Sequence, residues 1–391
     1  MLQNPQLHYL DNAATTIVAP EVADVINKAM REHWANPSSL YGPGARSEEA
    51  LNAARAAVAR TLGCKSRELY FTSCGSESNN LALLGAVQTR TFGKGIVVSG
   101  FEHPSVQRPL ERLAKQGYDV TVVAPRADGT LDIAAMLERV DKNTILVACM
   151  MVNNEIGTRN DVERLAAELK RRNSRTIVHV DAVQAWMRVP IKLDNIDTLS
   201  VSGHKIHGPK GVGLLYVGER VKIQPIVFGG GQQQNLRSGT ENVPGIAGLA
   251  KAAEMLYSHF DEDHARLCAC KKRFIEGVER LDQVKVNGLL PDAPYGEGTA
   301  AHIVSVSFAG VRSEVLLHAL EDKGIYVSAG SACSAHKPQP SATLKAIGID
   351  KSLLDSTIRF SFSVFTTEEE IDVCLQALYN IVPMLRRYSR R

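Results

Sequence analysis

The chain reads ILVA at 145–148, VERLAAELKRR at 162–172 and TIVHV at 176–180, and this stretch decides the fold. The first and last segments are dominated by apolar and β-branched residues, which is typical of short strands covered on both faces. The middle segment places apolar residues at the spacing of one helix face. A strand, a helix and a further strand in this order predict a βαβ unit with two parallel strands.

The same alternation extends from Glu68 to about Val217. Seven runs are predicted as strands: 69–72, 95–99, 120–123, 145–148, 176–180, 198–201 and 212–217. Four stretches between them are predicted as helices: 76–92, 104–116, 131–140 and 162–172. The last run follows its predecessor after only a short segment, and a parallel crossover needs about a dozen residues or more. We therefore expect an α/β domain with a mostly parallel seven-stranded sheet whose last strand is antiparallel.

A second, smaller α/β unit is predicted after the sheet. Residues 21–33 and 45–62 are predicted as helices before the sheet, and 243–284 as one long helix after it. Beyond that helix we expect strands at 303–308 and 357–363 and helices at 313–323 and 368–385. The predicted large domain covers 15–258, and the small domain covers 1–14 and 259–391. The small domain carries a loop of small residues at about 328–340, for which we expect mobility.

The composition is that of an ordinary globular protein. Of the 391 residues, 44% are hydrophobic and 22% are charged, and the formal net charge is +3. This balance indicates neither a nucleic acid nor an anionic membrane as partner. No apolar run is long enough to span a bilayer, no secretory signal is visible, and no metal-ligand spacing occurs. The seven cysteines are an odd number, which argues against a disulfide framework and favours a cytoplasmic location.

In parallel sheets, ligands bind beyond the carboxyl ends of the strands, so the residues that follow each run are the candidate site. The segment TSCGSESNN (72–80) leads from the first strand into a helix and contains Gly75 and Ser76. Small residues and a helix N-terminus suit a phosphate, although a capped helix start without a ligand has the same sequence. His103 follows the second strand, and Asn154 follows the fourth.

The fifth and sixth strands end in polar residues that suit a cofactor. Asp181 ends an apolar strand, where a carboxylate is costly unless it meets a cation or several donors. A pyridinium nitrogen is such a cation, and a helix cap is the alternative. The sixth strand is followed by SGHK (202–205), and Lys205 is well placed to form a Schiff base. Lys210 is the competing lysine, and Lys205 is favoured because it lies nearer the strand end.

Together these motifs resemble the cysteine desulfurases of the NifS/IscS group, which are fold type I, class V aminotransferase-like enzymes that use pyridoxal 5′-phosphate. The resemblance covers nearly the whole chain, and it is specific because the order and spacing of many motifs agree. The motifs are LDNAATT (10–16), NPSS (36–39), FTSCGSESNN (71–80), NNE (153–155), HVDAVQ (179–184), SGHK (202–205), GGGQ (229–232) and RSGTEN (237–242).

The resemblance implies a role for each matching residue. Lys205 binds the cofactor covalently, Asp181 pairs with the pyridine nitrogen, and Gln184 contacts the ring hydroxyl. His103 stacks on the ring and exchanges protons, as a catalytic residue beside Lys205. The phosphate cradle consists of Gly75, Ser76, Ser202 and His204, joined by Thr240 from the neighbouring subunit of a homodimer with shared active sites. The substrate carboxylate is held by Asn154, which also touches the cofactor, by Arg359, whose guanidinium suits a carboxylate, and by Asn36.

The sulfur chemistry is predicted to depend on Cys333, which lies in the segment SAGSACSA (328–335). Thiolate attack on the substrate sulfur needs a lowered pKa, for which His336 and Lys337 are nearby cations. A small buried cysteine without function is the alternative. Cys74 departs from the glycine that is more common in this family, and Tyr41 stands where histidine is common.

The leading hypothesis is a pyridoxal-phosphate-dependent conversion of L-cysteine to L-alanine, with a persulfide left on Cys333 for a protein acceptor. An iron–sulfur scaffold, a tRNA-thiolation protein and a general sulfurtransferase all stay open as the acceptor. A selenocysteine lyase, or another lyase of the same fold, is the second enzyme hypothesis, because fold alone does not fix the reaction. A non-enzymatic sulfur-relay scaffold is the third. The sequence names neither the acceptor nor an activator subunit.

Overall fold

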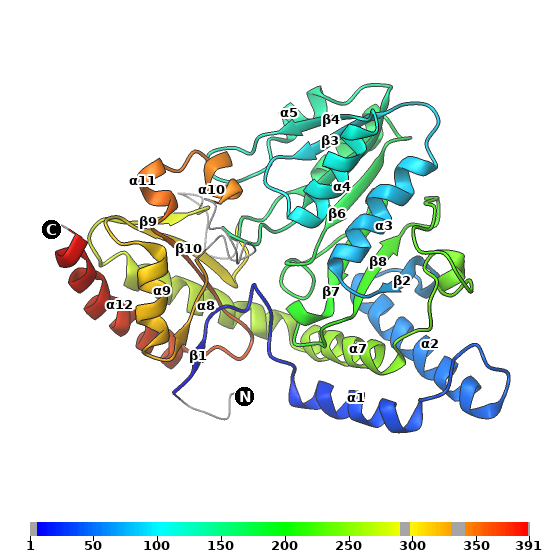
Figure 1. The fold of residues 1–391 in the computed structure, drawn as a ribbon, viewed down its shortest axis with the longest axis horizontal. Helices are drawn as coiled ribbons and strands as arrows, with labels where there is room; N and C mark the ends of the chain where they lie inside the picture. Colours follow the sequence, from blue (N-terminus) through cyan, green and yellow to red (C-terminus); the bar gives the residue numbers. More distant parts are fainter. Residues whose placement is uncertain (1–5, 290–297, 330–340, 390–391) are drawn as a thin grey trace.

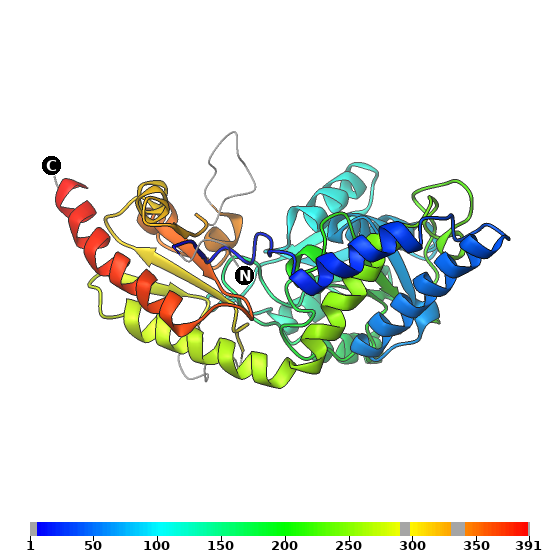
Figure 2. The same ribbon diagram turned by 90° about the horizontal axis from the view of Figure 1, so that it is seen from below.

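A computed structural model describes residues 6–289, 298–329 and 341–389, and it divides into two lobes (Figures 1 and 2). The larger lobe is built on a seven-stranded sheet of order β2-β8-β7-β6-β5-β3-β4. Its strands are β2 (Leu69–Thr72), β3 (Gly95–Ser99), β4 (Asp119–Val123), β5 (Thr144–Met150), β6 (Ile177–Asp181), β7 (Thr198–Ser202) and β8 (Gly213–Val217). β8 is antiparallel to both neighbours, and the other neighbouring pairs are parallel. The prediction of seven strands with an antiparallel last strand is confirmed.

Helices cover both faces of this sheet, as the apolar strands require. They are α1 (Pro20–Glu32), α2 (Gly42–Leu62), α3 (Gly75–Gln88), α4 (Pro104–Lys115), α5 (Ile133–Glu138), α6 (Val162–Arg172) and α7 (Val243–Ser258). Alternate residues of a strand point to opposite faces. Accordingly, Val178 and Val180 of β6 join the core that contains α6 and α7, whereas Ile177 joins the core that contains α3 and α4.

The smaller lobe contains a three-stranded antiparallel sheet of order β12-β10-β9. Its strands are β9 (Val284–Asn287), β10 (Ile303–Phe308) and β12 (Thr357–Ser361), and a separate pair is formed by β1 (His8–Tyr9) and β11 (Ile325–Tyr326). Its helices are α8 (Phe260–Val278), α9 (Ser313–Glu321), α10 (Ala342–Ala346), α11 (Lys351–Leu354) and α12 (Glu368–Ser389). Short helical turns η1 (Ser66–Glu68), η2 (Gly203–Lys205) and η3 (Gln233–Asn235) complete the described elements.

The single long helix predicted for 243–284 is wrong. The helix breaks at His259, whose backbone leaves the helical region, and the second helix ends at Val278, before a turn and the strand β9. The first turn of the new helix α8 contains Asp261, Glu262 and Asp263, and acidic residues are stabilised at a helix N-terminus by the helix dipole. This acidic triplet is the sequence signal for a second start. Because the chain passes from the larger lobe to the smaller one at this break, a domain boundary at 258/259 remains our proposal (Figure 1).

Candidate active site

The polar residues predicted from the strand ends gather at one edge of the large sheet. β3, β5, β6 and β7 run parallel, so Ser99, Met150, Asp181 and Ser202 end at the same edge. β8 runs the other way, and the loop before it closes this edge beside the start of α3. A β-carbon on Gly213 would lie 2.5 Å from the backbone of Cys74, so glycine is needed for this close approach. The topology therefore concentrates the predicted site residues.

The start of α3 has the properties of a phosphate site. The N-cap residue Cys74 makes no side-chain capping bond, and within the described residues no acceptor meets the N–H groups of Gly75, Ser76 and Glu77. The hydroxyl of Ser202 is buried and also has no hydrogen-bond partner in the part of the chain that the structure describes. A β-carbon on Gly75 would lie 2.6 Å from Val183 and 3.5 Å from Ser202. Unpaired donors at a helix N-terminus next to an orphaned hydroxyl fit the phosphate of the expected cofactor.

Asp181 is a buried carboxylate that is held by two donors. Its Oδ2 accepts from Asn79 Nδ2 at 2.8 Å, and its Oδ1 accepts from the backbone N–H of Val183 at 2.9 Å. Only 5% of the residue is exposed. These bonds fix the carboxylate in position, which fits a group that pairs with a protonated ring nitrogen.

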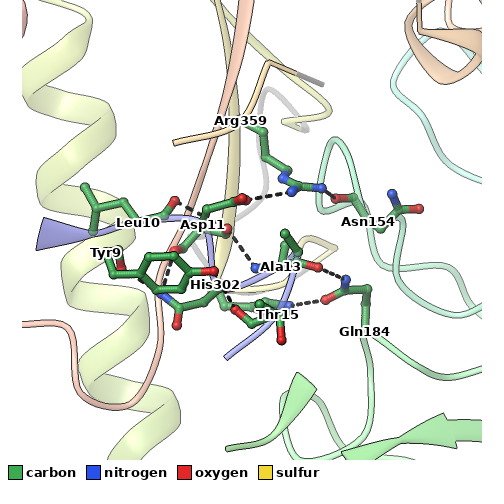
Figure 3. Close-up of polar contacts among 12 residues, drawn as sticks. Tyr9, Leu10, Asp11, Ala13, Thr15, Asn154, Gln184, His302 and Arg359 are labelled. Atoms are coloured by element: carbon green, nitrogen blue, oxygen red, sulfur yellow. Dashed lines mark hydrogen bonds and ion pairs between the residues drawn. The ribbon is translucent and has the colours of Figure 1, made fainter. Parts of the chain in front are cut away.

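Lys205 and Gln184 converge on the chain segment that links β1 to α1. Lys205 Nζ donates to the carbonyl oxygens of Ala13 (2.6 Å) and Ala14 (2.8 Å). Figure 3 shows the second contact to Ala13, in which Gln184 Nε2 donates to the same carbonyl oxygen at 2.8 Å. The competing lysine, Lys210, is exposed. Lys205, the predicted Schiff-base lysine, and Gln184, the predicted contact of the ring hydroxyl, therefore meet at the carbonyl oxygen of Ala13.

Arg359 lies on β12 and reaches across the boundary between the lobes. Its guanidinium donates to Asp11 Oδ1 and to the carbonyl oxygen of Asn154, each at 2.8 Å, while Asn154 presents its side-chain amide away from the guanidinium (Figure 3). Arg359 is 6% exposed, and its Nε has no partner among the described residues. A buried guanidinium with a donor to spare fits the capture of a carboxylate.

Cys333 lies outside the described residues, but both flanks of the segment 330–340 are described. Ser328 forms a reciprocal backbone pair with Arg359 (3.1 and 2.7 Å). Ser341 donates its hydroxyl to Glu155 Oε2, and Thr343 donates to Glu155 Oε1 at 3.1 Å. Burial raises the pKa of Glu155, although these hydroxyls and Arg359 oppose the shift. Both flanks are thus attached next to the groups that we expect to hold the substrate carboxylate.

Two histidines of the site are held neutral. Burial lowers the pKa of His103; the Asp181 carboxylate opposes this shift, and the Lys205 ammonium adds to it. Burial, followed by Lys205 and Lys210, lowers the pKa of His204 to about 4. His204 Nδ1 lies 3.1 Å from the hydroxyl of Thr15. Neutral imidazoles add no positive charge beside Lys205.

Thr240 and Asn36 are not brought to the other site residues by contacts within the described chain. Thr240 is exposed, and Asn36 is exposed in the connection between α1 and α2, where its side chain accepts from Ser38 N and its backbone carbonyl accepts from Ser39 N. This connection lies at the end of the larger lobe that is remote from the smaller lobe (Figures 1 and 2). Both assignments remain predictions, and among the described residues Asn36 has no contact that supports a substrate role.

The segment that carries Thr240 is anchored to the start of α3 and is strained. Arg237 forms an ion pair with Glu77 at 2.7 Å. Gln233, Gln234 and Asn235 have φ values of 48, 55 and 65°, a left-handed turn that costs L-residues roughly 1–2 kcal/mol each. Strain of this kind persists where the surroundings impose it, often at functional sites. Here the buried side chain of Gln233 imposes it, by accepting from Phe71 N on the edge strand β2 at 3.0 Å.

Several residues of the site were not assigned a role from the sequence. Asn79 and Asp11 belong to the quoted motifs, so the motifs themselves were the available signal. His302 has no such signal: it lies 118 positions from Gln184, and its Nε2 is 3.3 Å from Gln184 Oε1 (Figure 3). Contacts between residues so distant in sequence leave no local pattern.

Glu102, which precedes His103, is a buried acid whose protonation should affect stability. Its Oε1 accepts from Ser99 Oγ and from Met150 N, and burial raises its pKa from 4.5 to about 8. The folded chain therefore binds a proton that the unfolded chain releases above pH 4.5, so the stability contributed by this group is lost as pH rises toward 8.

We expect Glu102→Gln to remove this loss, since glutamine keeps an acceptor for Ser99 and Met150. The free energy of unfolding of the variant, relative to the wild type, should rise by up to ~1.4 kcal/mol per pH unit between about 4.5 and 8. Urea unfolding across this interval measures the difference. A difference that does not change with pH would contradict a neutral Glu102.

The fold, together with a sheet edge whose residues fit a phosphate-bearing cofactor, defines a class of protein. Comparisons with known proteins agree with this class. Residues 8–374 match the Aminotransferase class-V family model, and the chain belongs to that family, whose cofactor is pyridoxal 5′-phosphate. It is 39% identical to the cysteine desulfurase IscS of Methanosarcina thermophila over 384 residues, covering 97% of this chain and 93% of that protein. It is 38% identical to the cysteine desulfurase IscS of Dictyoglomus turgidum, covering 97% and 96%. Within the class, the chain belongs to the cysteine desulfurase family.

Solved structures give the same result. A NifS-like protein superposes with a TM-score of 0.89 at 34% identity, covering 96% of this chain and 99% of that one. SspA in complex with cysteine superposes with a TM-score of 0.79 at 30% identity, covering 92% and 100%. The expected fold, a large domain with a mostly parallel sheet plus a smaller α/β domain of the fold type I kind, is confirmed.

Two further properties concern the described residues, namely membrane insertion and metal binding. None of the helices described has the length and apolar character needed to cross a membrane. No group of three or more histidine, cysteine, aspartate or glutamate side chains is arranged there as a metal site.

Proposed function

We propose that this chain is a pyridoxal-phosphate-dependent cysteine desulfurase that converts L-cysteine to L-alanine and keeps the sulfur as a persulfide on Cys333. The observation that carries the proposal is the convergence of Lys205, Gln184 and Arg359 on the single segment from Asp11 to Ala14. This one segment thereby positions three groups. They are the amine of Lys205, the amide of Gln184 that contacts the ring hydroxyl, and the guanidinium of Arg359 that binds the substrate carboxylate.

Each residue has a physical task in this reaction. The bound cofactor supplies an electron sink for the bonds at the substrate Cα. The N-terminus of α3 and Ser202 hold its phosphate, and Asp181 stabilises a positive charge on its ring nitrogen. Arg359 binds the substrate carboxylate, which requires it to share or exchange its bond to Asp11. Lys205 and His103 are the groups that exchange protons with the substrate.

The sulfur step uses Cys333 as the nucleophile. Its thiolate forms an S–S bond with the sulfur of the substrate while the substrate Cβ–S bond breaks, and protonation of the carbon skeleton yields alanine. The sulfur leaves the substrate without an external oxidant, because the electron pair of the broken bond stays with the carbon skeleton. The attachment of Ser328 to Arg359 and of Ser341 to Glu155 supports access of this thiol to the site.

The test is an assay of the holoenzyme with L-cysteine, followed by peptide mass spectrometry. We expect alanine in amounts equal to the sulfur transferred and a persulfide on the peptide that contains Cys333. Parallel turnover of selenocysteine and cysteine sulfinate tests the other lyase activity. Turnover of these two compounds but not of cysteine would overturn the proposal. A purified protein that binds no cofactor would overturn it in favour of the relay-scaffold hypothesis.

The proposal includes a homodimer in which Thr240 completes the partner's phosphate site. Large apolar side chains are exposed near Thr240's end of the larger lobe: Trp34 is 68%, Leu40 104% and Phe228 80% exposed. Exposed apolar groups of this size are typical of protein interfaces. The segments that carry them lie at the same remote end of the larger lobe in both views (Figures 1 and 2).

We expect the double variant Trp34→Asp, Leu40→Asp to weaken self-association by roughly thirty-fold or more, since buried aromatic anchors dominate interface energies. Desulfurase activity should fall with the loss of the dimer. Sedimentation velocity measures the mass, and Val373→Asp, an exposed apolar position on α12, is the matched control. A double variant that remains as dimeric as the control would place the interface elsewhere.

The proposal also covers the acceptor and the compartment. We propose a protein sulfur acceptor, of the iron–sulfur cluster assembly or tRNA thiolation kind, in the cytoplasm. The six described cysteines are all unpaired, which supports a reducing compartment. Pulldown with persulfide-loaded protein, followed by tracing of the transferred sulfur, identifies the acceptor.

A further inference from the structure

A chain of hydrogen bonds runs behind the site and links Asp181 to His103. Asn79 Nδ2 donates to Asp181 Oδ2 and also to Ser105 Oγ, each at 2.8 Å. Ser105 Oγ in turn lies 2.8 Å from His103 Nδ1. On the other side of Asn79, its Oδ1 lies 3.0 Å from His179 Nε2. The connection therefore joins residues of α3, α4 and β6.

The direction of the bonds around Asn79 is determined by chemistry. A carboxylate only accepts, so Asn79 must present its NH₂ group to Asp181. Its carbonyl oxygen then faces His179 Nε2, which must donate. His179 is consequently left with Nδ1 as an acceptor for Thr198 Oγ1 at 2.9 Å. Burial lowers the pKa of His179 to about 3, in agreement with this neutral form.

The direction at His103 is determined independently. The backbone N–H of Ser105 donates to His103 Nδ1 at 3.1 Å, and a backbone N–H can only donate. Ser105 Oγ already accepts from Asn79, so its own hydrogen is available for the same Nδ1. Nδ1 is thus an acceptor for two donors, and in the neutral ring the hydrogen must sit on Nε2.

We propose that Ser105 and Asn79 are positioning residues that hold His103 in the Nε2–H form and tie its ring to the Asp181 carboxylate, so that Nε2 is the atom through which His103 exchanges protons. This inference rests on the proposed function, in which His103 and Asp181 act on the same bound cofactor. Donors to the neutral ring favour the neutral ring, and they act in the same direction as burial, which lowers the pKa of His103.

The test uses Ser105→Ala, with Ser105→Thr as the conservative variant that restores the hydroxyl. Removing one donor to neutral Nδ1 should raise the pKa of His103, so the acid limb of the kcat profile should move up by roughly half to one pH unit. We expect kcat to fall about ten-fold with KM unchanged within about two-fold, and the threonine variant to recover both. Gln88→Ala, an exposed amide on α3, is the control.

A second readout does not depend on activity. In protein labelled with ¹⁵N-histidine, the signals that are lost in His103→Gln identify His103. We expect the Nε2–H pattern in the wild type and a higher titration midpoint in Ser105→Ala. A wild-type Nδ1–H pattern, or an unchanged acid limb in Ser105→Ala, would overturn this inference. A wild-type holoenzyme that forms no alanine from cysteine would instead overturn the proposed function, and the tautomer result would stand by itself.

Discussion

Lys205→Ala is expected to lower cysteine turnover by a factor on the order of 10³ or more and to abolish the yellow absorbance of the holoenzyme. The reason is both covalent and electrostatic. Lys205 is the amine that is held by the carbonyl oxygens of Ala13 and Ala14, next to Gln184. Its removal takes away the covalent attachment of the cofactor and a positive charge that lowers the pKa of His103 and of His204.

The matched control for this variant is Lys210→Ala. Lys210 is exposed five positions further along the chain and was the competing lysine in the sequence. We expect it to keep the absorbance and nearly all of the turnover. If Lys210→Ala lost the absorbance and Lys205→Ala kept it, the assignment of the lysine would be wrong.

The large sheet could be predicted from the sequence because its signals are local. The seven runs agree with the observed strands to within two residues at each end, since continuous apolar runs flanked by polar or small residues leave little choice. The strand β9 was missed because Val284 and Val286 are only half-buried in a short strand next to a helix end. The break at His259 was missed because apolar periodicity continues on both sides of it.

The site could be predicted where a residue follows a strand, and not where it is held by a distant segment. Asp181 and Ser202 end β6 and β7, and Lys205 follows directly, so the edge rule for parallel sheets finds them. The bond from Ser341 to Glu155 joins residues 186 positions apart, and the bond from Arg359 to Asp11 joins residues 348 apart. Such contacts depend on how the two lobes are assembled, which no local spacing encodes.

The thiol that receives the sulfur can be selected from among the seven cysteines. The pKa values of the described thiols reduce the number of candidates. Burial raises the pKa of Cys64 to about 12 and also raises those of Cys149, Cys268, Cys270 and Cys374. Because the thiolate is the nucleophile, these five are poor candidates. Two cysteines remain, Cys333 in the segment 330–340 and Cys74 at the N-terminus of α3.

Cys333→Ala is therefore expected to lower alanine formation from cysteine by roughly 10³-fold while the absorbance of the bound cofactor stays intact. The retained absorbance distinguishes Cys333→Ala from Lys205→Ala, which should lose both the absorbance and the turnover. The substrate would still be bound by Arg359, since the bonds of Arg359 to Asp11 and Asn154 do not involve the thiol. Absorbance changes on adding cysteine measure binding, and alanine release measures turnover.

Two companion variants make the result decisive. Cys268→Ala removes a half-buried thiol on α8 and should behave like the wild type. Cys74→Ala removes the other candidate, and we expect the persulfide to remain on Cys333 in this variant. If the persulfide mapped to Cys74 and Cys333→Ala kept its rate, the sulfur would be taken up beside the phosphate site. The flanking attachments of Ser328 and Ser341 would then have to serve the structure of the small lobe alone, whereas a rate that depends on Cys333 gives both attachments a direct role in bringing the thiol to the substrate.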